Sequence, residues 1–211
     1  MNDIETRRGA AVRLAEALRL LNDSAALTEV GVPDLNAATA MIRDLINRLT
    51  ARTRQGSLAS IDDIQRGIRM FNPVSGQACP VAPPMLFDQV AGDTPLIGRV
   101  TLGPLHEGHI GLAHGGVIAL LFDQVLGVAA QRRVRECVTA QLSVRYVKPV
   151  RIGIPLTVTG DVYQEAGRQM RVRAAICAAA EPERLLAEAD AVLVKLRPEQ
   201  VQSMSFSPSR S

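Results

Sequence analysis

The chain has 211 residues, of which 47% are hydrophobic, a length suited to one domain or to a domain of about 140 residues with an appendage. Two Tyr, four Phe and no Trp are too few for a nucleic-acid platform that stacks bases on aromatic rings. The net charge of +3 is spread along the chain without a dense basic block, so we expect no nucleic-acid partner.

The first 55 residues predict two amphipathic helices. In the first, aliphatic residues recur at helical spacing from Ile4 to Leu21, and Asn22-Asp23-Ser24 is expected to end it. The second is expected to start after Gly31-Val32-Pro33, with Asp34 as its N-cap. Residues 51–84 are rich in Gly, Pro and Ser and predict a linker with one helical turn near 61–70.

The rest of the chain alternates differently and predicts an α+β domain. A strand is expected over 94–102, with 85–90 as a second candidate strand before it, followed by a loop over 106–116 and an apolar helix over 116–130. Four antiparallel strands then follow over 139–147, 155–163, 169–178 and 187–196, with hairpin turns at 165–168 and 181–184. We therefore divide the chain into an N-terminal helical extension (1–70), a main domain (71–198) and a flexible tail (199–211).

The cysteines and the apolar runs indicate the compartment in which the protein is expected. The three cysteines are far apart and form no CxxC pair, which excludes a disulfide framework and a structural zinc site. The N-terminus lacks the uninterrupted apolar core of a signal peptide, and no apolar run reaches the length of a membrane span. We expect a cytoplasmic protein that does not associate with membranes.

Residues 106–127 hold all three histidines, a glycine pair and one acid in an apolar run. A helix that begins near Gly116 places free backbone N–H groups beside His114 and Gly115, and Asp123 follows about two turns later. A helix start that stabilises an anion, with a carboxylate on the same helix, suits acyl transfer. The spacing of His106, His109 and His114 matches no zinc pattern, so we predict no metal and no cofactor.

The position of Asp123 allows two interpretations. The helix is apolar almost all round, which is typical of a buried helix, and Asp123 and Gln124 interrupt it. The two polar residues either face a solvent-filled groove and serve solubility, or they serve a site. Gly116 and Gly127 lie on the same stripe as Asp123 and leave room for a ligand or a second chain.

The stretch GHIGLAHGGVIALLFDQVLG resembles the HGG signature of hotdog-fold acyl-CoA thioesterases, of the PaaI type and the thioesterase-superfamily-member enzymes. Asp123 follows His114 by nine residues, as in that signature, and the next strand runs from Thr139 to Tyr146 and Pro149 in the family's pattern. The resemblance covers residues 85–197. It implies a hotdog fold, an antiparallel sheet wrapped around a central helix, with the first 70 residues as a helical addition.

The resemblance also implies hydrolysis of acyl-CoA thioesters and a role for each matching residue. The Gly115 N–H would stabilise the tetrahedral oxyanion, and Asp123 would act as general base or as nucleophile. Thr139 would position the water or the acid, and His114 would shape the carbonyl pocket. Some family members carry an oxyanion-assisting Asn or Gln where this chain has Gly108, a role for which Glu107 or His109 would substitute.

Family sites lie between two protomers, so the resemblance implies a homodimer or a dimer of dimers, with acyl-CoA as the partner molecule. The helix and the scarcity of aromatics suit an aliphatic acyl chain of medium or long length. The substrate-binding candidates lie in the signature and near the end of the strand that follows it: Gly116, Gln124, Arg145, Lys148 and Arg151. Of these, Arg145, Lys148 and Arg151 are the candidates for binding the phosphates of coenzyme A.

Two other functions fit the same fold less well. A non-catalytic sensor would bind acyl-CoA and use the N-terminal helices to bind DNA or a protein, but eight Arg against seven acidic residues in 1–55 give no basic footprint for DNA. A hydratase or dehydratase needs a D-x-N-x-x-H-type pattern, and none occurs here. We expect the N-terminal helices to pack on the exposed face of the sheet or to cap the substrate tunnel.

Overall fold

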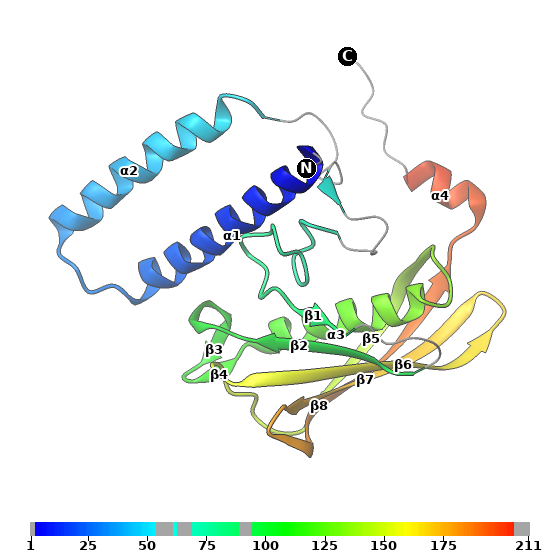
Figure 1. The fold of residues 1–211 in the computed structure, drawn as a ribbon. Coiled ribbons are helices and arrows are strands. Elements are labelled where there is room, and N and C mark those ends of the chain that lie inside the picture. The colour runs from blue at the N-terminus through cyan, green and yellow to red at the C-terminus, as the bar shows by residue number, and fades with distance from the viewer. Residues whose placement is uncertain (1–2, 54–60, 63–68, 89–93, 205–211) are drawn as a thin grey trace.

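The computed structural model describes residues 3–53, 61–62, 69–88 and 94–204. Two long helices come first, and a sheet with one central helix forms the rest of the molecule (Figure 1). The elements in chain order are α1 (Asp3–Leu27), α2 (Val32–Thr50), β1 (Leu86–Phe87), β2 (Leu96–Thr101), the 3₁₀ helix η2 (Pro104–His106), β3 (Glu107–His109), β4 (Leu112–Ala113), α3 (Gly115–Gln131), β5 (Cys137–Tyr146), β6 (Pro155–Ala166), β7 (Gln169–Ala178), β8 (Glu181–Lys195) and α4 (Pro198–Met204).

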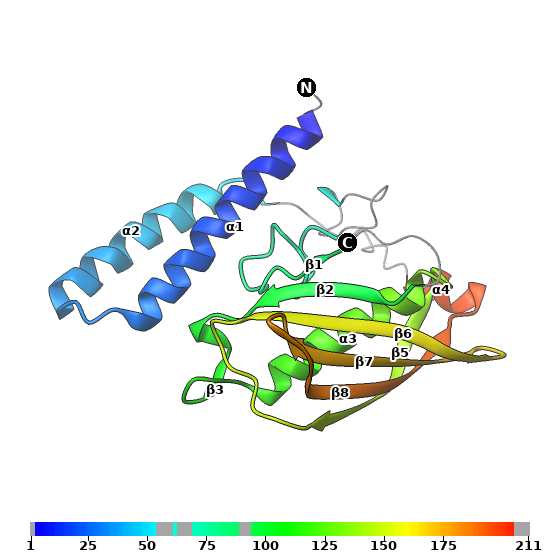
Figure 2. The ribbon, with the colours of Figure 1, turned by 60° about the horizontal axis from the view of Figure 1, so that its bottom comes forward.

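The sheet has six antiparallel strands in the order β1-β2-β6-β7-β8-β5, and it curves around α3 (Figure 2). This confirms the expected α+β hotdog architecture. The chain leaves α3 into β5 at one edge of the sheet and then crosses through residues 147–154 to β6. The sheet is therefore not a simple meander, and β5 is an edge strand that pairs only with β8.

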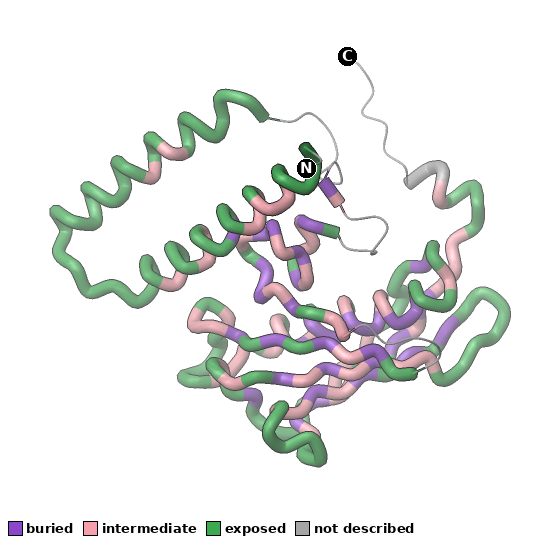
Figure 3. Tube along the Cα trace, viewed as in Figure 1, coloured by how far each residue is buried: buried purple, intermediate pink, exposed green. Residues whose placement is uncertain are grey.

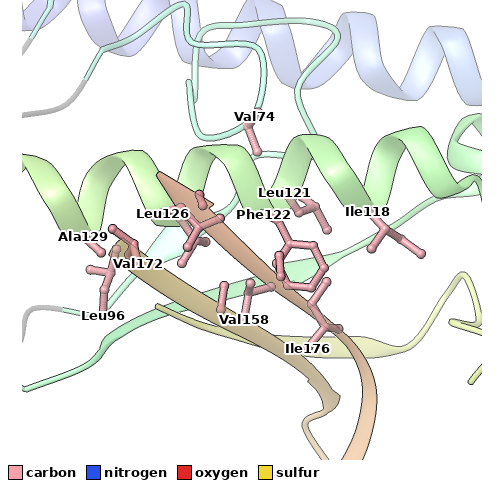
Figure 4. Packing of buried hydrophobic residues seen from close by; sticks show 14 of the residues in the cluster. Val74, Leu96, Ile118, Leu121, Phe122, Leu126, Ala129, Val158, Val172 and Ile176 are labelled. Atoms are coloured by element: carbon pink, nitrogen blue, oxygen red, sulfur yellow. The ribbon is translucent and has the colours of Figure 1, made fainter. Parts of the chain in front are cut away.

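The core lies between α3 and the inner face of the sheet. Leu121, Phe122 and Val125 are fully buried and pack toward strand residues such as Val158 and Ile176 (Figure 4). A Cβ atom on Gly160 of β6 would come within 2.6 Å of Val125 Cγ1, so only glycine lets the helix lie this close to the strand. The prediction of a largely buried apolar helix is confirmed, and its exposed stripe carries Asp123.

The N-terminal helices differ from expectation in extent and packing. Helix α1 continues to Leu27, beyond the expected end at Asn22–Ser24. Helix α2 begins at Val32 with Gly31 as N-cap, so the assignment of Asp34 was wrong; the Asp34 amide donates to the Gly31 carbonyl, which places Asp34 inside the first turn. Among the described residues, α1 packs on Ile61, on the segment 70–78 and on η2 rather than on the sheet, and α2 has no buried residue (Figure 3).

Of the predictions for the two hairpin turns and the tail, one agrees with the structure and two differ from it. The β6–β7 turn lies at Gly167, as predicted, where φ is +58°, a value that favours glycine. The second turn lies at 179–180, so its prediction at 181–184 was wrong: β8 already begins at Glu181, and Pro182, which has no N–H for the ladder, lies in an irregular stretch of its register. The tail forms α4 over Pro198–Met204, and 205–211 lie outside the described residues.

The remaining linker predictions are tested only in part. The expected strand over 85–90 is reduced to β1, Leu86–Phe87, and residues 89–93 lie outside the described residues. Most of the helical turn expected near 61–70 lies outside them as well. Residues 69–85 form a series of turns rather than an open linker, and several of their side chains are buried.

Candidate active site

The loop before α3 is held by backbone and histidine hydrogen bonds. His114 is the N-cap of α3, and its Nδ1 accepts a hydrogen bond from the Gly116 N–H at 3.0 Å. The neutral imidazole therefore carries its hydrogen on Nε2. The His114 N–H donates to the His106 carbonyl at 2.8 Å, and Nδ1 of His106 accepts from Gly103. Two of the three histidines thus have structural partners.

Gly115 provides the first half of a site. No residue that the structure describes accepts a hydrogen bond from the Gly115 N–H, which lies at the positive end of the α3 dipole. Its carbonyl accepts from the Tyr146 hydroxyl at 2.9 Å. A pocket of about 580 Å³ borders on Gly115, His109, Tyr146 and Lys148. A free N–H in such a pocket is an anion donor of the oxyanion-hole kind.

The sequence indicates Tyr146 only as part of the pattern of the strand after the helix and predicts no role for its side chain. In the structure it joins the end of β5 to the start of α3, because its hydroxyl reaches the Gly115 carbonyl across 31 residues of chain. The only signal for this contact in the sequence is the aromatic residue near the end of the strand after the helix.

Gly108 shows why the chain lacks a side-chain donor here. A Cβ atom at Gly108 would lie 2.6 Å from His114 Cα and 2.8 Å from its Cβ, so no side chain fits without moving the loop. The Glu107 carboxylate, one proposed substitute, accepts a hydrogen bond from the Gly111 N–H within its own hairpin. A carboxylate donates no hydrogen bond when ionised, whereas His109 borders the Gly115 pocket and stays a candidate.

We expect the Gly108→Ala variant to be less active and less stable than the wild type. The added methyl group meets backbone atoms of His114, which must shift together with the cap of α3. An overpacked site of this kind costs about 1–3 kcal/mol. Thermal melting and thioester turnover check this, with Gly111→Asn as the matched control on the same hairpin, where no atom lies within 4 Å of the added Cβ and Asn tolerates the positive φ. Unchanged melting and turnover for Gly108→Ala would contradict the packing argument.

Asp123 and Thr139 form the second half of the site. The Thr139 hydroxyl donates to Asp123 Oδ1 at 2.8 Å, and both residues are exposed. The register of β5 against β8 shifts between Thr139 and Gln141, a bulge of the kind that re-aims a side chain next to a site. Thr139 orients the carboxylate, no described residue donates a hydrogen bond to Oδ2, and Asp123 lines a pocket of about 940 Å³.

The other substrate-binding candidates differ in whether they border a pocket and in whether other residues already bind them. Gln124 borders the Asp123 pocket, but its amide is hydrogen-bonded to Asn72 and Ser75. Arg145 forms an exposed ion pair with Glu188 at 2.7 Å, which occupies its guanidinium. Lys148 borders the Gly115 pocket, whereas Arg151 is exposed near the β4 bridge. The Gly116 N–H is used by His114.

The two halves of the site lie too far apart in one chain to act on one carbonyl. Gly115 and Asp123 are eight residues apart on α3, which corresponds to roughly 12 Å along the helix. An oxyanion donor lies about 3 Å from the reacting oxygen, and a base or nucleophile must reach the same carbonyl group. Each half therefore needs a complementary half from elsewhere.

Other chemistry finds little support among the described residues. Burial raises the pKa of the Cys137 thiol, which borders the Asp123 pocket, and neighbouring Glu136 adds to this, so the nucleophilic thiolate is scarce near neutral pH. Within the described ranges no group of three His, Cys, Asp or Glu could hold a metal ion. Of the helices there, none is long and apolar enough to cross a membrane.

Comparisons with known proteins relate the chain to thioesterases. A family model described as "Thioesterase superfamily" matches residues 110–184. The acyl-coenzyme A thioesterase THEM4 of Xenopus laevis is 32% identical over 96 residues, which make up 46% of this chain. The match spans only 43% of the length of that relative. A crystal structure described as a thioesterase superfamily protein is similar with a TM-score of 0.77 and 29% identity, covering 87% of this chain and 94% of its own.

The last of these comparisons also concerns the N-terminal extension. Residues 71–211 make up about two thirds of the chain, so a match over 87% of it takes in part of residues 1–70. At least part of the extension is therefore matched in a solved structure.

Proposed function

We propose that the protein hydrolyses acyl-CoA thioesters to the free acid and coenzyme A, a proposal supported by the match of residues 110–184 to the thioesterase superfamily model. The observation that carries this proposal is the coexistence of two half-sites: an Asp123 carboxylate oriented by Thr139, and a Gly115 N–H without a protein acceptor among the described residues. These are the two groups that thioester hydrolysis needs.

The chemistry assigned to each group follows from its geometry. The Gly115 N–H binds the thioester carbonyl oxygen and stabilises the oxyanion as the carbonyl carbon is attacked. Asp123 Oδ2 either removes the proton from the attacking water or attacks the carbon itself, while Oδ1 stays bonded to Thr139. In the general-base route, the C–S bond breaks, the proton taken from water passes to the sulfur, and the oxygen of water ends in the carboxylic acid. In the nucleophilic route, breaking of the C–S bond leaves an acyl-Asp123 anhydride, the thiolate of coenzyme A takes up a proton from solvent, and water then hydrolyses the anhydride to the acid and the free Asp123 carboxylate.

We propose that the active unit is a homodimer in which Asp123 and Thr139 of one protomer face Gly115 of the other. Strand β5 supports this arrangement, because it is a ten-residue edge strand with mostly exposed residues and carries Thr139. A long uncovered edge is a surface that pairs with another strand. Pairing of two β5 strands about a two-fold axis makes two equivalent contacts and hence two sites. A dimer of dimers repeats this unit.

Thiol release from a series of acyl-CoA substrates tests the function directly. We expect turnover with the wild-type protein and a preference for aliphatic acyl chains, with Lys148 at the Gly115 pocket meeting the phosphates of coenzyme A. Binding of acyl-CoA without any thiol release would overturn hydrolysis and leave the sensor function instead.

A purified heterodimer tests whether the site is shared. Asp123→Asn and Gly115→Pro protomers with different affinity tags are co-expressed, and the mixed dimer is isolated. Each variant alone loses both sites, but a mixed dimer with shared sites has one intact site, so about half of the wild-type activity is expected. A mixed dimer as inactive as the two single variants would show that each chain holds its own site. The matched control is a dimer of two Asp123→Asn protomers that carry the two different tags and are isolated in the same way.

A further inference from the structure

Residues 69–79 lie between α1 and α3 and pack against both helices. Val74, only 2% exposed, is part of the main core and lies beside α3 (Figure 4). Met70 and Ala78, from the same segment, are buried in a second cluster that includes Ala11 and Val12 of α1. The segment therefore packs against both helices and is fixed by both.

The segment keeps its shape through a tight turn around Asn72. Oδ1 of Asn72 accepts hydrogen bonds from the N–H groups of Val74 and Ser75 at 2.8 and 2.9 Å, and the Gly76 N–H donates to the Asn72 carbonyl. A Cβ atom at Gly76 would lie 2.4 Å from the Asn72 nitrogen and 2.7 Å from the Met70 oxygen, so the turn accepts only glycine there.

The same turn is bonded to α3 beside Asp123. Nδ2 of Asn72 donates to Gln124 Oε1 at 2.9 Å, and Nε2 of Gln124 donates to Ser75 Oγ at 3.2 Å. Three partly buried side chains thus close a ring of hydrogen bonds, and one of them directly follows the candidate catalytic acid.

Residues 69–79 form one side of the Asp123 pocket. The segment contributes four polar side chains, from Arg69, Asn72, Ser75 and Gln77. The rest of the lining comes mainly from β1, β2, β5, β8 and the second half of α3. It combines polar residues such as Asp88, Gln131 and Arg132 with a set of apolar side chains that an acyl chain can contact: Leu86, Phe87, Leu96, Val128 and Leu193. The pocket extends along α3 from Asp123 to Gln131, a length of roughly 12 Å.

Helix α1 supports this side of the pocket from behind. Nη1 of Arg19 donates to the carbonyls of Cys79 at 2.8 Å and Gln77 at 3.3 Å, and Ala15 is 1% exposed. Gln77 itself lines the pocket. A change in α1 is therefore transmitted to the pocket through the main chain of residues 77–79.

We propose that residues 69–79, the segment that joins the N-terminal extension to the main domain, are the wall of the acyl pocket, and that Asn72 is the positioning residue that locks this wall to α3 through Gln124. This inference rests on the proposed thioesterase function. It makes the junction between the extension and the main domain part of the active site, with α1 as its support, and it makes the wall a determinant of acyl-chain selectivity. A long acyl chain contacts the wall, whereas an acetyl group does not extend along it.

A double-mutant cycle over Asn72→Ala and Gln124→Ala tests the lock. We expect kcat/KM for octanoyl-CoA to fall about tenfold in each single variant and that for acetyl-CoA about twofold, because a displaced wall affects the longer chain more. The double variant is expected to lose no more than the stronger single variant, since both remove one shared contact. A merely destabilised protein would lose activity on both substrates to the same extent. Equal losses, or losses that add fully, would overturn the proposal.

A second pair of variants tests the support from α1. Arg19→Ala is expected to shift the octanoyl-to-acetyl ratio in the same direction as Asn72→Ala, whereas Arg13→Ala, an exposed change on the same helix, leaves the ratio unchanged. If Asn72→Ala does not fold, Asn72→Asp keeps the Oδ1 acceptor and loses only the donor to Gln124. An inactive wild type would refute the proposed function, whereas an active wild type with unchanged ratios in all variants would refute the wall alone.

Discussion

Asp123→Asn is expected to reduce kcat for acyl-CoA hydrolysis by about 10³-fold while the protein stays folded. The exposed side chain makes one described hydrogen bond, from the Thr139 hydroxyl at 2.8 Å, and an Asn Oδ1 can accept the same bond. The variant therefore loses the proton-accepting and nucleophilic oxygen and little else. Thiol release measures the activity, and thermal melting together with acyl-CoA binding by calorimetry serves as the control.

Residual activity above about a tenth of the wild type would contradict this role, because general-base catalysis alone is typically worth 10²–10⁴-fold. A single turnover of the wild type in ¹⁸O-labelled water separates the two routes open to Asp123. As a general base, Asp123 directs the label into the released acid only. As a nucleophile, Asp123 forms an anhydride, and attack of water on the Asp123 carboxyl carbon places the label in the protein.

The helix and most of the sheet could be predicted because their signals are local. Period-two alternation marks β5 to β8, and an apolar run interrupted only by Asp123 and Gln124 marks α3. The pairing of Asp123 with Thr139 could be expected only from the family pattern, since 16 residues and a β-bulge separate them. The turn at 181–184 was misplaced because charged residues and Pro182 also suit a strand irregularity at a sheet end.

The wall of the Asp123 pocket could not be predicted, and the reason is physical. Gly, Pro and Ser in residues 51–84 indicate turns, but turn propensity says nothing of what a turn packs against. Asn72 and Gln124 meet across 52 residues, and neither carries a local sign of the other. The apolar stripe of α2 led to the opposite error: it predicted burial, but the structure buries no residue of α2, and only Ile42 and Leu45 are partly covered.

Gly115→Pro, compared with Gly115→Ala, isolates the oxyanion donor. Gly115 is the first residue of α3, where proline is well tolerated, because the N–H at this position has no helical partner. His114 before it has φ −63° and ψ 135°, which suits a residue that precedes proline. The proline variant therefore removes one N–H and keeps the helix start.

Alanine is the matched control for size. A Cβ atom at position 115 lies 3.2 Å from the Tyr146 hydroxyl in either variant, so both carry the same close contact, but only alanine keeps the N–H. We expect Gly115→Ala to lower kcat several-fold, and Gly115→Pro to lower it by a further 10²–10³-fold, the usual effect of losing one oxyanion donor. Steady-state kinetics with one acyl-CoA, beside melting curves for both variants, give the comparison. Equal kcat values for the two variants would exclude the Gly115 N–H as the donor and leave the Nε2–H of His114 as the group next to the carbonyl.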